Sequence, residues 1–292
     1  MDKIIIEVGS TNTKIDFYDG THVKRLDELT ILFKQNYQLN GFIDENDVDI
    51  LVNKIIELKK VYDNIYVCGT SIFRDLNDSD KEKFLNSFFD KTGIEFDIIS
   101  QDKENELTVL GATRFVDEKV CVFVGGGGST EISIFDGTIT ENKNTNIGVM
   151  DVMRKFPDLA NDYASTPLEE VMEYIEERLN VPSDKADILI LAGGGHEVFA
   201  RGSGIEYEDN TLYKDDCATI MMDIETRISE TKRFFKEISL NDIKNRVTNP
   251  DWWFATRAMC AFVLVAAKKI EAKYVIPTNI SMVYGVLEKN ND

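Results

Sequence analysis

Gly125-Gly126-Gly127-Gly128-Ser129-Thr130-Glu131 is the stretch of sequence that decides the fold. It follows an apolar run, residues 119–124, that predicts a β-strand, and a second strand is predicted over residues 132–135. Four successive glycines lose much backbone entropy on folding, and this cost needs a reason. We infer that the missing side chains let another group approach the backbone closely. Because strands are predicted on both sides, we interpret this turn as a phosphate contact rather than as a flexible linker.

The same pattern of strand, polar turn and strand occurs near the N-terminus. Residues 3–8 form a β-branched run that ends at Gly9, and residues 14–18 resume it after a turn rich in hydroxyl groups. Both repeats close on an Asp-Gly pair, at residues 19–20 and at residues 136–137. The repetition predicts two related domains, residues 1–118 and residues 119–292. Taken alone, the first turn leaves open both a phosphate site and an ordinary polar hairpin.

Helices and strands alternate in the rest of the chain, which indicates an α/β protein. A length of 292 residues makes two domains the natural expectation. Helices are predicted over residues 47–60, 80–92, 104–114, 169–179, 223–238, 252–270 and 281–287. Further strands are predicted over residues 64–68, 96–99, 188–191 and 274–276.

Composition narrows the classes of partner. The net charge of −19, from 33 basic and 52 acidic residues, repels phosphate backbones, so neither general nucleic-acid binding nor binding to anionic membranes is expected. The N-terminus lacks the pattern of a secretion signal and no apolar run approaches the roughly 18 residues of a membrane span, so we expect a cytoplasmic protein. An anionic ligand would need backbone amides, a few basic side chains and a divalent cation.

A third glycine turn, Gly193-Gly194-Gly195, precedes His196 and follows another apolar strand. It could contact a nucleotide base or sugar, or form the entrance to a helix. It matches neither the P-loop nor the dinucleotide fingerprint. We interpret His196 as a packed residue rather than as a catalyst, and the four scattered cysteines as free thiols.

Together these segments resemble the exopolyphosphatase and guanosine pentaphosphatase (Ppx/GppA) phosphatases of the actin-like ATPase superfamily. The resemblance spans most of the chain, and the second turn is its most specific part. The similar segments are Glu7-Val8-Gly9-Ser10-Thr11-Asn12-Thr13, Gly69-Thr70-Ser71-Ile72-Phe73-Arg74-Asp75, residues 98–112, Gly126-Gly127-Gly128-Ser129-Thr130-Glu131, residues 146–149 and residues 193–195.

The resemblance implies two actin-like (ribonuclease H-like) α/β domains with a cleft between them, across which the two turns face each other. It leaves open a last helix that packs back on the first domain. It implies Glu104 as the general base, and Glu7 and Glu131 as ligands of a magnesium ion. The phosphate-binding residues that it implies are Gly9, Ser10, Thr11, Asn12, Thr13, Arg74, Gly126, Gly127, Gly128, Ser129 and Thr130.

The chain also departs from the family pattern. Glu7 stands where the family usually has aspartate, and Val124 stands where an aspartate is expected just before the second turn. Asn105 follows Glu104 where the family has alanine, and residues 283–285 replace an Arg-Glu-Gly step. These changes bear on catalytic rate and substrate length more than on the fold.

We therefore expect a magnesium-dependent phosphohydrolase that releases terminal phosphate from inorganic polyphosphate or from a guanosine pentaphosphate-like nucleotide. One alternative is a binding protein that senses such a polyanion without turning it over, because the carboxylate expected at Val124 is missing. Another is an ATP-dependent kinase or activase of the same fold. A homodimer is also left open by the sequence.

Overall fold

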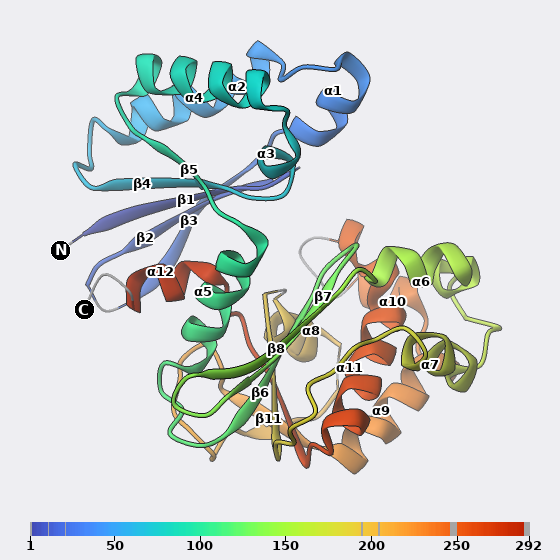
Figure 1. Cartoon of the computed structure of the whole chain (residues 1–292). Coiled ribbons are helices and arrows are strands. Elements are labelled where there is room, and N and C mark those ends of the chain that lie inside the picture. The colour runs from blue at the N-terminus through green and yellow to red at the C-terminus, as the bar shows by residue number, and fades with distance from the viewer. Residues whose placement is uncertain are drawn as a thin grey trace. The chain divides into compact units, whose positions relative to one another are not determined.

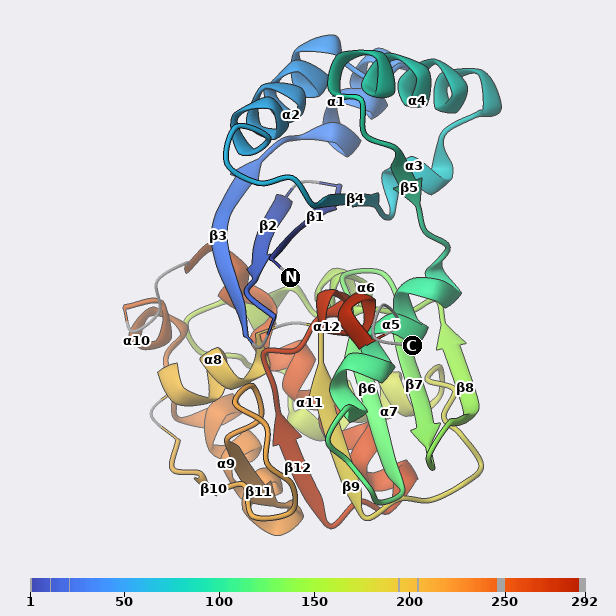
Figure 2. The ribbon, with the colours of Figure 1, turned by 90° about the vertical axis from the view of Figure 1, so that its left-hand side faces the viewer.

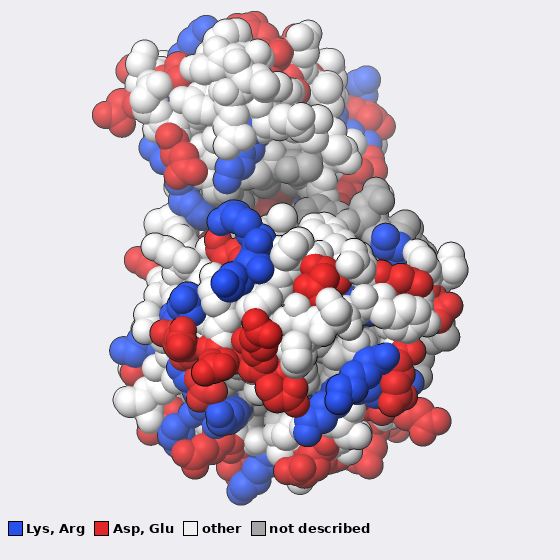
Figure 3. Space-filling view, turned by 90° about the vertical axis from the view of Figure 1, so that its right-hand side faces the viewer, with Lys and Arg blue, Asp and Glu red and all other residues white. Residues whose placement is uncertain are grey.

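The computed structural model describes residues 2–10, 12–20, 22–193, 195–203, 205–245 and 250–288. The chain separates into two compact units, Met1–Glu104 and Asn105–Asp292 (Figure 1). Within the described residues, no helix has both the length and the apolar composition that a membrane span needs. Basic and acidic side chains are interspersed over the face drawn in Figure 3.

The first unit is a five-stranded mixed sheet with the order β3-β2-β1-β4-β5. Helices cover the face of this sheet to which β1 turns Ile4, Ile6 and Val8 (Figure 2). Glu7, between two of these core residues, belongs to the opposite face because successive side chains of a strand alternate. The elements are β1 (Lys3–Val8), β2 (Asn12–Tyr18), β3 (Val23–Thr30), α1 (Phe33–Asn40), α2 (Glu45–Leu58), β4 (Ile65–Gly69), α3 (Ile72–Asp75), α4 (Asp78–Thr92) and β5 (Phe96–Ile98).

Local signals explain where the helices of this unit begin and end. Asp44 caps α2 by accepting a hydrogen bond from the backbone N–H of Asn46. Asn77 caps α4 by accepting one from the N–H of Asp80, and Gly93 ends α4 in the left-handed conformation. The helix predicted over residues 80–92 therefore ends at the predicted residue, Thr92.

The second unit is a seven-stranded sheet with the order β10-β11-β12-β9-β6-β7-β8. Residues of α6, α7 and α11 pack on one of its faces, and residues of α5 pack on the other. Its elements are α5 (Gln101–Thr113), which begins in the first unit, β6 (Val120–Gly125), β7 (Thr130–Phe135), β8 (Ile139–Thr145), α6 (Val149–Lys155), η1 (Pro157–Ala160), α7 (Leu168–Glu176), β9 (Ile188–Ala192), α8 (His196–Gly202), β10 (Glu208–Asp209), β11 (Ile220–Asp223), α9 (Ile224–Lys236), α10 (Leu240–Lys244), η2 (Pro250–Ala255), α11 (Thr256–Ile270), β12 (Tyr274–Pro277) and α12 (Met282–Glu288).

The two sheets share one topology. In each, a three-stranded antiparallel meander is extended by parallel strands on the side of its first strand, as β3-β2-β1-β4-β5 and as β8-β7-β6-β9-β12. The internal repeat predicted from the two turns is present in the fold. The compact units divide at residues 104 and 105, earlier than the repeat suggests, because Val109 and Ala112 of α5 pack with the second sheet.

The last helix, α12, packs against α5. A Cβ atom at Gly285 would lie 1.9 Å from the carbonyl oxygen of Leu107, and one at Gly111 would lie 2.8 Å from Cβ of Tyr284. Only glycine permits this approach of the two helices. Both contacts belong to the second unit.

Candidate functional site

Three parallel strands of the first unit end at the same edge of its sheet. In the register of the sheet, Val8 of β1 pairs with Gly69 of β4, and Gly69 pairs with Ile98 of β5. The backbone N–H of Thr70 donates to Val8 (3.1 Å), and that of Ile99 donates to Gly69 (3.1 Å). The first turn, the Arg74 segment and the start of α5 therefore meet at this edge. Ligands of open α/β sheets bind outside the carboxyl ends of parallel strands.

The first turn is tight. The N–H of Gly9 donates to the carbonyl of Asn12 at 2.9 Å, and a Cβ atom at Gly9 would lie 2.8 Å from the same oxygen. The carbonyl of Ser10 accepts a hydrogen bond from Lys34, which ties the turn to α1. Thr11 lies outside the described residues.

Ser10 joins the first turn to the Arg74 segment. Its hydroxyl donates to the hydroxyl of Ser71 at 2.8 Å. Ser71 has a φ of 46°, which is uncommon and strained for a residue other than glycine. Such strain often accompanies functional sites, since the surrounding structure must hold it in place.

Glu7 and Lys14 face each other across β1 and β2, and their charged groups are 3.1 Å apart. Attraction by Glu7 raises the pKa of Lys14, which outweighs the opposite effect of burial and keeps the ammonium charged. The second carboxylate oxygen of Glu7, Oε2, is buried and makes no hydrogen bond to any described residue. Lys14 is a charged residue of this turn that the predicted site did not include.

That orphaned oxygen bears on whether the residues fit magnesium. Magnesium in phosphoryl-transfer sites is held by one or two carboxylates together with waters and substrate phosphates. Oε2 of Glu7 is a buried oxygen suited to such a contact, and Glu131 of the second unit is a second buried carboxylate. The described residues contain no group of three metal-ligating side chains, so a ready-made protein cage is not what these residues offer. Each of these carboxylates, taken in its own unit, suits an ion that receives most of its ligands from water and substrate.

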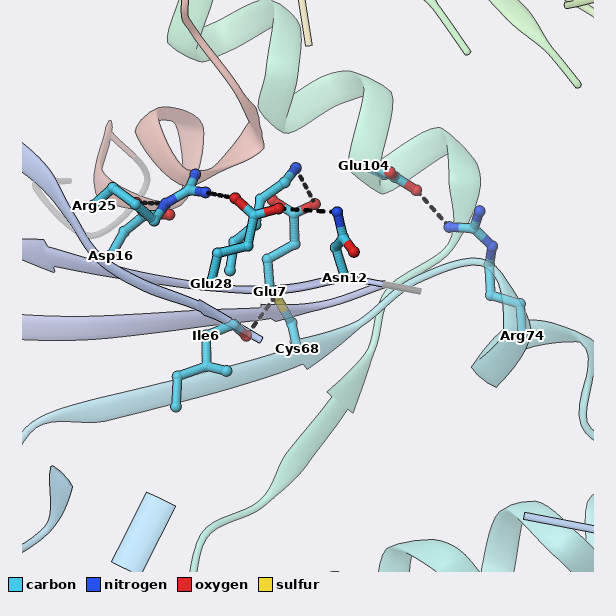
Figure 4. Close-up of polar contacts among 10 residues, drawn as sticks. Ile6, Glu7, Asn12, Asp16, Arg25, Glu28, Cys68, Arg74 and Glu104 are labelled. Atoms are coloured by element: carbon cyan, nitrogen blue, oxygen red, sulfur yellow. Dashed lines mark hydrogen bonds and ion pairs between the residues drawn. The ribbon is translucent and has the colours of Figure 1, made fainter. Parts of the chain in front are cut away.

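Arg74 and Glu104 form the shortest ion pair at this edge. Nη1 of Arg74 donates to Oε2 of Glu104 at 2.6 Å and to the carbonyl of Ile99 at 3.3 Å. Figure 4 shows the two side chains pointing toward one another from α3 and from the first turn of α5. Both side chains are partly exposed, so the pair is open to a ligand.

Strands β2 and β3 carry a chain of polar contacts next to Glu7 and Lys14 (Figure 4). The amide of Asn12 donates to Glu28 at 2.9 Å, and Arg25 donates to both Glu28 and Asp16. Thr13 is fully buried and its hydroxyl has no hydrogen-bond partner. The predicted phosphate contacts of Asn12 and Thr13 remain predictions.

Cys68 lies close enough to Glu7 and Glu104 for their charges to act on its thiol. Burial raises the pKa of Cys68 well above its ordinary value, and the two carboxylates raise it further. The thiol of Cys68 donates a hydrogen bond to the carbonyl oxygen of Ile6, with Sγ 3.7 Å from that oxygen. The thiol stays protonated, so it is not suited to act as a nucleophile.

The second turn connects β6 and β7 and is held by the first residues of α6. The N–H of Gly126 donates to Ser129 at 2.9 Å, while the carbonyls of Gly126 and Gly127 accept from Val149 and Met150. Gly127 and Gly128 are exposed, and nothing lies within 4 Å of where a Cβ of Gly128 would be. The backbone of the turn is thus fixed on one side and open to a ligand on the other.

The residues that follow the glycines differ in their roles. Thr130 is buried and its hydroxyl donates to the carbonyl of Ile147 at 2.8 Å, so it holds the turn. Glu131 is buried and pairs in register with Val124. Val124 packs with the apolar cluster of β6 and β9, where it offers no oxygen to a cation.

The third glycine turn is also placed at the end of a parallel strand, β9. Gly193 and Gly195 have φ values of 85° and 63°, which favour glycine; Gly194 lies outside the described residues. His196, the first residue of α8, is buried, and burial together with the charge of Arg227 lowers its pKa to about 4. It is neutral at pH 7, which agrees with a packed residue.

Asn105, the residue after Glu104, is anchored in the second unit. Its Nδ2 donates to Ser133 of β7 at 3.2 Å and to Asn142 of β8 at 3.1 Å, and Ser133 itself donates to Asn142. Asn105 is buried, and its Oδ1 has no hydrogen-bond partner. The first turn of α5 therefore holds Glu104 on Arg74 and Asn105 on the second sheet. The departure from alanine at this position was the only signal of this anchor in the sequence.

Comparison with known proteins places the chain. The model of the Ppx/GppA phosphatase family matches residues 24–239. A bifunctional 3-dehydroquinate synthase/phosphatase from Fusobacterium nucleatum is 28% identical over 169 residues. That match covers 52% of this chain and 24% of the relative, so the chain corresponds to about a quarter of that protein's length.

Solved structures show the fold. A Ppx/GppA phosphatase from Aquifex aeolicus, in its type II variant, has a TM-score of 0.77 at 16% identity and covers 99% of both chains. An exopolyphosphatase from Cytophaga hutchinsonii has a TM-score of 0.73 at 15% identity, and the match covers 99% of this chain and 97% of the other. The predicted two-domain, actin-like α/β fold is thereby confirmed. Since the family model spans well over half of the sequence, the chain belongs to the Ppx/GppA phosphatase family.

Proposed function

We propose that the protein is a phosphohydrolase that releases terminal phosphate from inorganic polyphosphate or from a guanosine pentaphosphate-like nucleotide. The observation that supports this most is the Arg74–Glu104 pair at 2.6 Å, at an edge where the Ser10–Ser71 contact also lies. A cation that binds phosphate and a carboxylate that can accept a proton stand next to each other there. Membership of the family and its structural likeness to a Ppx/GppA phosphatase and an exopolyphosphatase support this activity.

Each residue of the first-unit site would have its own role in hydrolysis. The other guanidinium nitrogens of Arg74, which make no hydrogen bond to described residues, would donate to phosphate oxygens of the substrate. Glu104 would accept the proton of the attacking water, and the Ser10 hydroxyl and the backbone of the turn would orient the phosphate. Lys14, whose charge Glu7 maintains, would offset part of the substrate's charge.

The second turn would bind phosphate through its backbone N–H groups. The carbonyls of Gly126 and Gly127 accept hydrogen bonds from the first two residues of α6, which fixes the orientation of these glycine peptides. Preorganised backbone dipoles of this kind stabilise the charge that develops in phosphoryl transfer. Bound magnesium, held by Glu7 and Glu131 together with waters, would supply charge neutralisation on the phosphate oxygens. The partner class is thus a polyanion of phosphate, and we propose a cytoplasmic location.

Replacement of Glu104 tests the hydrolase. In Glu104→Gln we expect phosphate release from both substrates to fall by roughly 10²–10⁴-fold, because the amide cannot accept the proton of water. Asp102→Asn, an exposed acid of the same helical turn, is the matched control and should stay within a fewfold of the wild type. Equal phosphate release by Glu104→Gln and the wild type would rule out Glu104 as the base.

Chelation tests the metal separately. With EDTA we expect turnover to be lost and to return on addition of magnesium, whereas phosphate release that persists at every EDTA concentration would exclude the cation. Glu7→Gln should raise the magnesium concentration needed for half-maximal activity. Glu45→Gln, an exposed acid of α2 in the same unit, is the control and should not.

A second candidate function is binding without turnover, and the position of Val124 favours it. Its side chain lies in an apolar cluster where the family pattern has a carboxylate. In this case calorimetry would find binding of polyphosphate by the wild type with no phosphate release at any metal concentration. Val124→Asp would then bring turnover above background.

A further inference from the structure

Among the described residues of the second unit, two arginines are buried, and one of them shows how the fold accommodates such a charge. Arg257 of α11 is 0% exposed. Its guanidinium donates to the carbonyls of Leu159, Asn161, Asp162, Ile238 and Phe234, at distances of 2.7 to 3.5 Å. These oxygens replace water around the charge, so Arg257 is accounted for by structure alone.

Arg227 of α9 is different. It is 6% exposed, and its contacts are to Tyr207 Oη (3.2 Å) and Cys260 Sγ (3.6 Å), while its Nε has no hydrogen-bond partner. Burial raises the pKa of both Tyr207 and Cys260, so neither group supplies a negative charge. Arginine does not lose its proton in proteins. Among the described residues, no carboxylate lies within ion-pair distance of this buried cation.

Two acids on α9 and α8 have other partners. Glu230, one turn away on α9, pairs with Arg233 at 2.8 Å. Glu197, on α8, is held by Arg201 and by the amide of Asn279. Neither carboxylate is available to balance the charge of Arg227.

Other buried polar atoms near Arg227 also lack partners. Nε2 of His196 is buried without a hydrogen bond, and His196 is near enough for the charge of Arg227 to act on it. The hydroxyl of Thr231 is buried without a partner one helical turn after Arg227, on the same side of α9. Phe199 of α8, Phe234 of α9 and Cys260 of α11 belong to one apolar cluster, which brings the three helices together (Figure 2).

An isolated buried charge is strongly unfavourable, and proteins that keep one pair it or use it to bind a ligand. We propose that Arg227, His196, Thr231 and Tyr207 form a second anion site, separate from the glycine-rich phosphate turns, that binds a phosphate-sized oxyanion. Nε of Arg227 and the hydroxyls of Thr231 and Tyr207 donate to it, and His196 adds an Nε2–H donor in one tautomer. Donors from several side chains match an oxyanion with several acceptor atoms better than a halide. The partly exposed Tyr207 marks the side from which the anion enters.

The test compares Arg227→Met with Arg233→Met, a partly exposed arginine of the same helix. Thermal unfolding of each protein is followed while inorganic phosphate replaces chloride at constant ionic strength. All variants are made in an Arg74→Met background. This substitution should weaken phosphate binding near the glycine-rich turns, so that binding there does not dominate the result. We expect phosphate to raise the unfolding midpoint of the background protein and of the Arg233→Met variant, and we expect the Arg227→Met variant to lose this rise.

A second readout does not depend on ligand affinity. In phosphate-free buffer the Arg227→Met variant should unfold a few degrees higher than its background, because an uncompensated buried charge is gone. In wild type, the ¹H–¹⁵N signal of Arg227 Nε should shift with phosphate and saturate, and should stay in place with chloride. A midpoint that falls in phosphate-free buffer, or an unchanged phosphate effect in Arg227→Met, would overturn the site.

The alternative to a bound anion is a Cys260 thiol that has lost its proton despite its raised pKa. The Cys260→Ala variant distinguishes a compensating thiolate from a bound anion. If the thiolate balances Arg227, its removal should lower the unfolding midpoint sharply in phosphate-free buffer and leave no phosphate effect. With the proposed site, Cys260→Ala retains the phosphate-dependent rise. None of these measurements requires hydrolysis, so they test the anion site independently of the proposed phosphohydrolase activity.

Discussion

At the scale of single residues, Gly148 illustrates how sterics hold the second turn. A Cβ atom at Gly148 would lie 2.5 Å from the carbonyl carbon and oxygen of Gly127 and from the nitrogen of Gly128. Its φ of −137° and ψ of −176° are open to any residue, so glycine is required here for space and not for backbone freedom.

Gly148→Ala is therefore expected to destabilise the protein by roughly 1–3 kcal/mol, because the second turn must move to admit the methyl group. Chemical denaturation with urea measures this loss. Gly128→Ala is the control for stability, since nothing lies within 4 Å of its Cβ position. If both substitutions lower the midpoint equally, the contact between Gly148 and the turn is not what stabilises this region.

His196 gives a prediction for pH dependence. Its folded pKa of about 4 lies below the ordinary value of 6.5, so the unfolded chain binds the proton more readily. The contribution to stability is complete above pH 6.5 and is lost as pH falls toward 4, by about 3 kcal/mol. Urea unfolding of His196→Gln should show a smaller decrease than wild type over this window. Parallel curves for the two proteins would mean that His196 titrates normally in the fold.

How far the sequence predicts the site also depends on individual residues. Arg74 and Glu104 were both expected to act on phosphate, but their direct pairing depends on strands β4 and β5 being neighbours. The Glu7–Lys14 pair requires the register of β1 and β2, which the turn length sets only once the strand ends are known. The positive φ of Ser71 could not be predicted from the sequence, because serine occurs in most loop conformations and does not signal a left-handed one.

At the scale of elements, α5 is the helix in which the two units meet. Asn105→Ala removes two hydrogen bonds and leaves the buried Ser133 and the exposed Asn142 with fewer partners, which should reduce stability by roughly 1–3 kcal/mol. Because Asn105 adjoins Glu104, we also expect kcat to fall more than KM changes. Hydrogen exchange of residues 101–108 should become faster, and this readout applies whether or not hydrolysis is detected.

Ser133→Ala is the matched variant for this helix, since it removes the partner and keeps Asn105. The double variant should lose less than the sum of the two single losses, because both substitutions break the same contact. Strict additivity would show that Asn105 and Ser133 stabilise the protein independently.

Most strands with an apolar face were predicted from the sequence, whereas the two polar strands β3 and β8 were not. β1 and β7 follow from runs of β-branched and aromatic residues. β3 and β8 carry the sequences VKRLDELT and ITENKNT, in which most side chains are polar and more than half are exposed or half-buried. They are strands because each pairs with an adjacent strand of a meander, β2 or β7. Because this pairing depends on backbone hydrogen bonds to the neighbouring strand, β3 and β8 show no alternation of apolar and polar residues from which a strand could be predicted.

At the scale of the whole molecule, the internal repeat and the compact units place the domain boundary differently. The repeat begins again at β6, but α5 contributes Val109 and Ala112 to the core that covers one face of the second sheet. A repeat detected from strands and turns does not include a helix that precedes the strands. The repeat therefore identifies the two sheets but not the helix that the second one needs.

Fragments of the second unit test this assignment. A fragment of residues 101–292 keeps α5, and it should show helical and strand signals in circular dichroism and a cooperative thermal transition. A fragment of residues 119–292 lacks Val109, Ala112 and the Asn105 anchor, which exposes the face formed by Val120, Val122 and Ile190. Each exposed side chain of this size forfeits roughly 1.5–3 kcal/mol, and the total approaches the stability of a whole domain. We therefore expect the shorter fragment to lack a cooperative transition. Identical transitions in both fragments would place α5 outside the second domain, as the boundary at residue 118 implies.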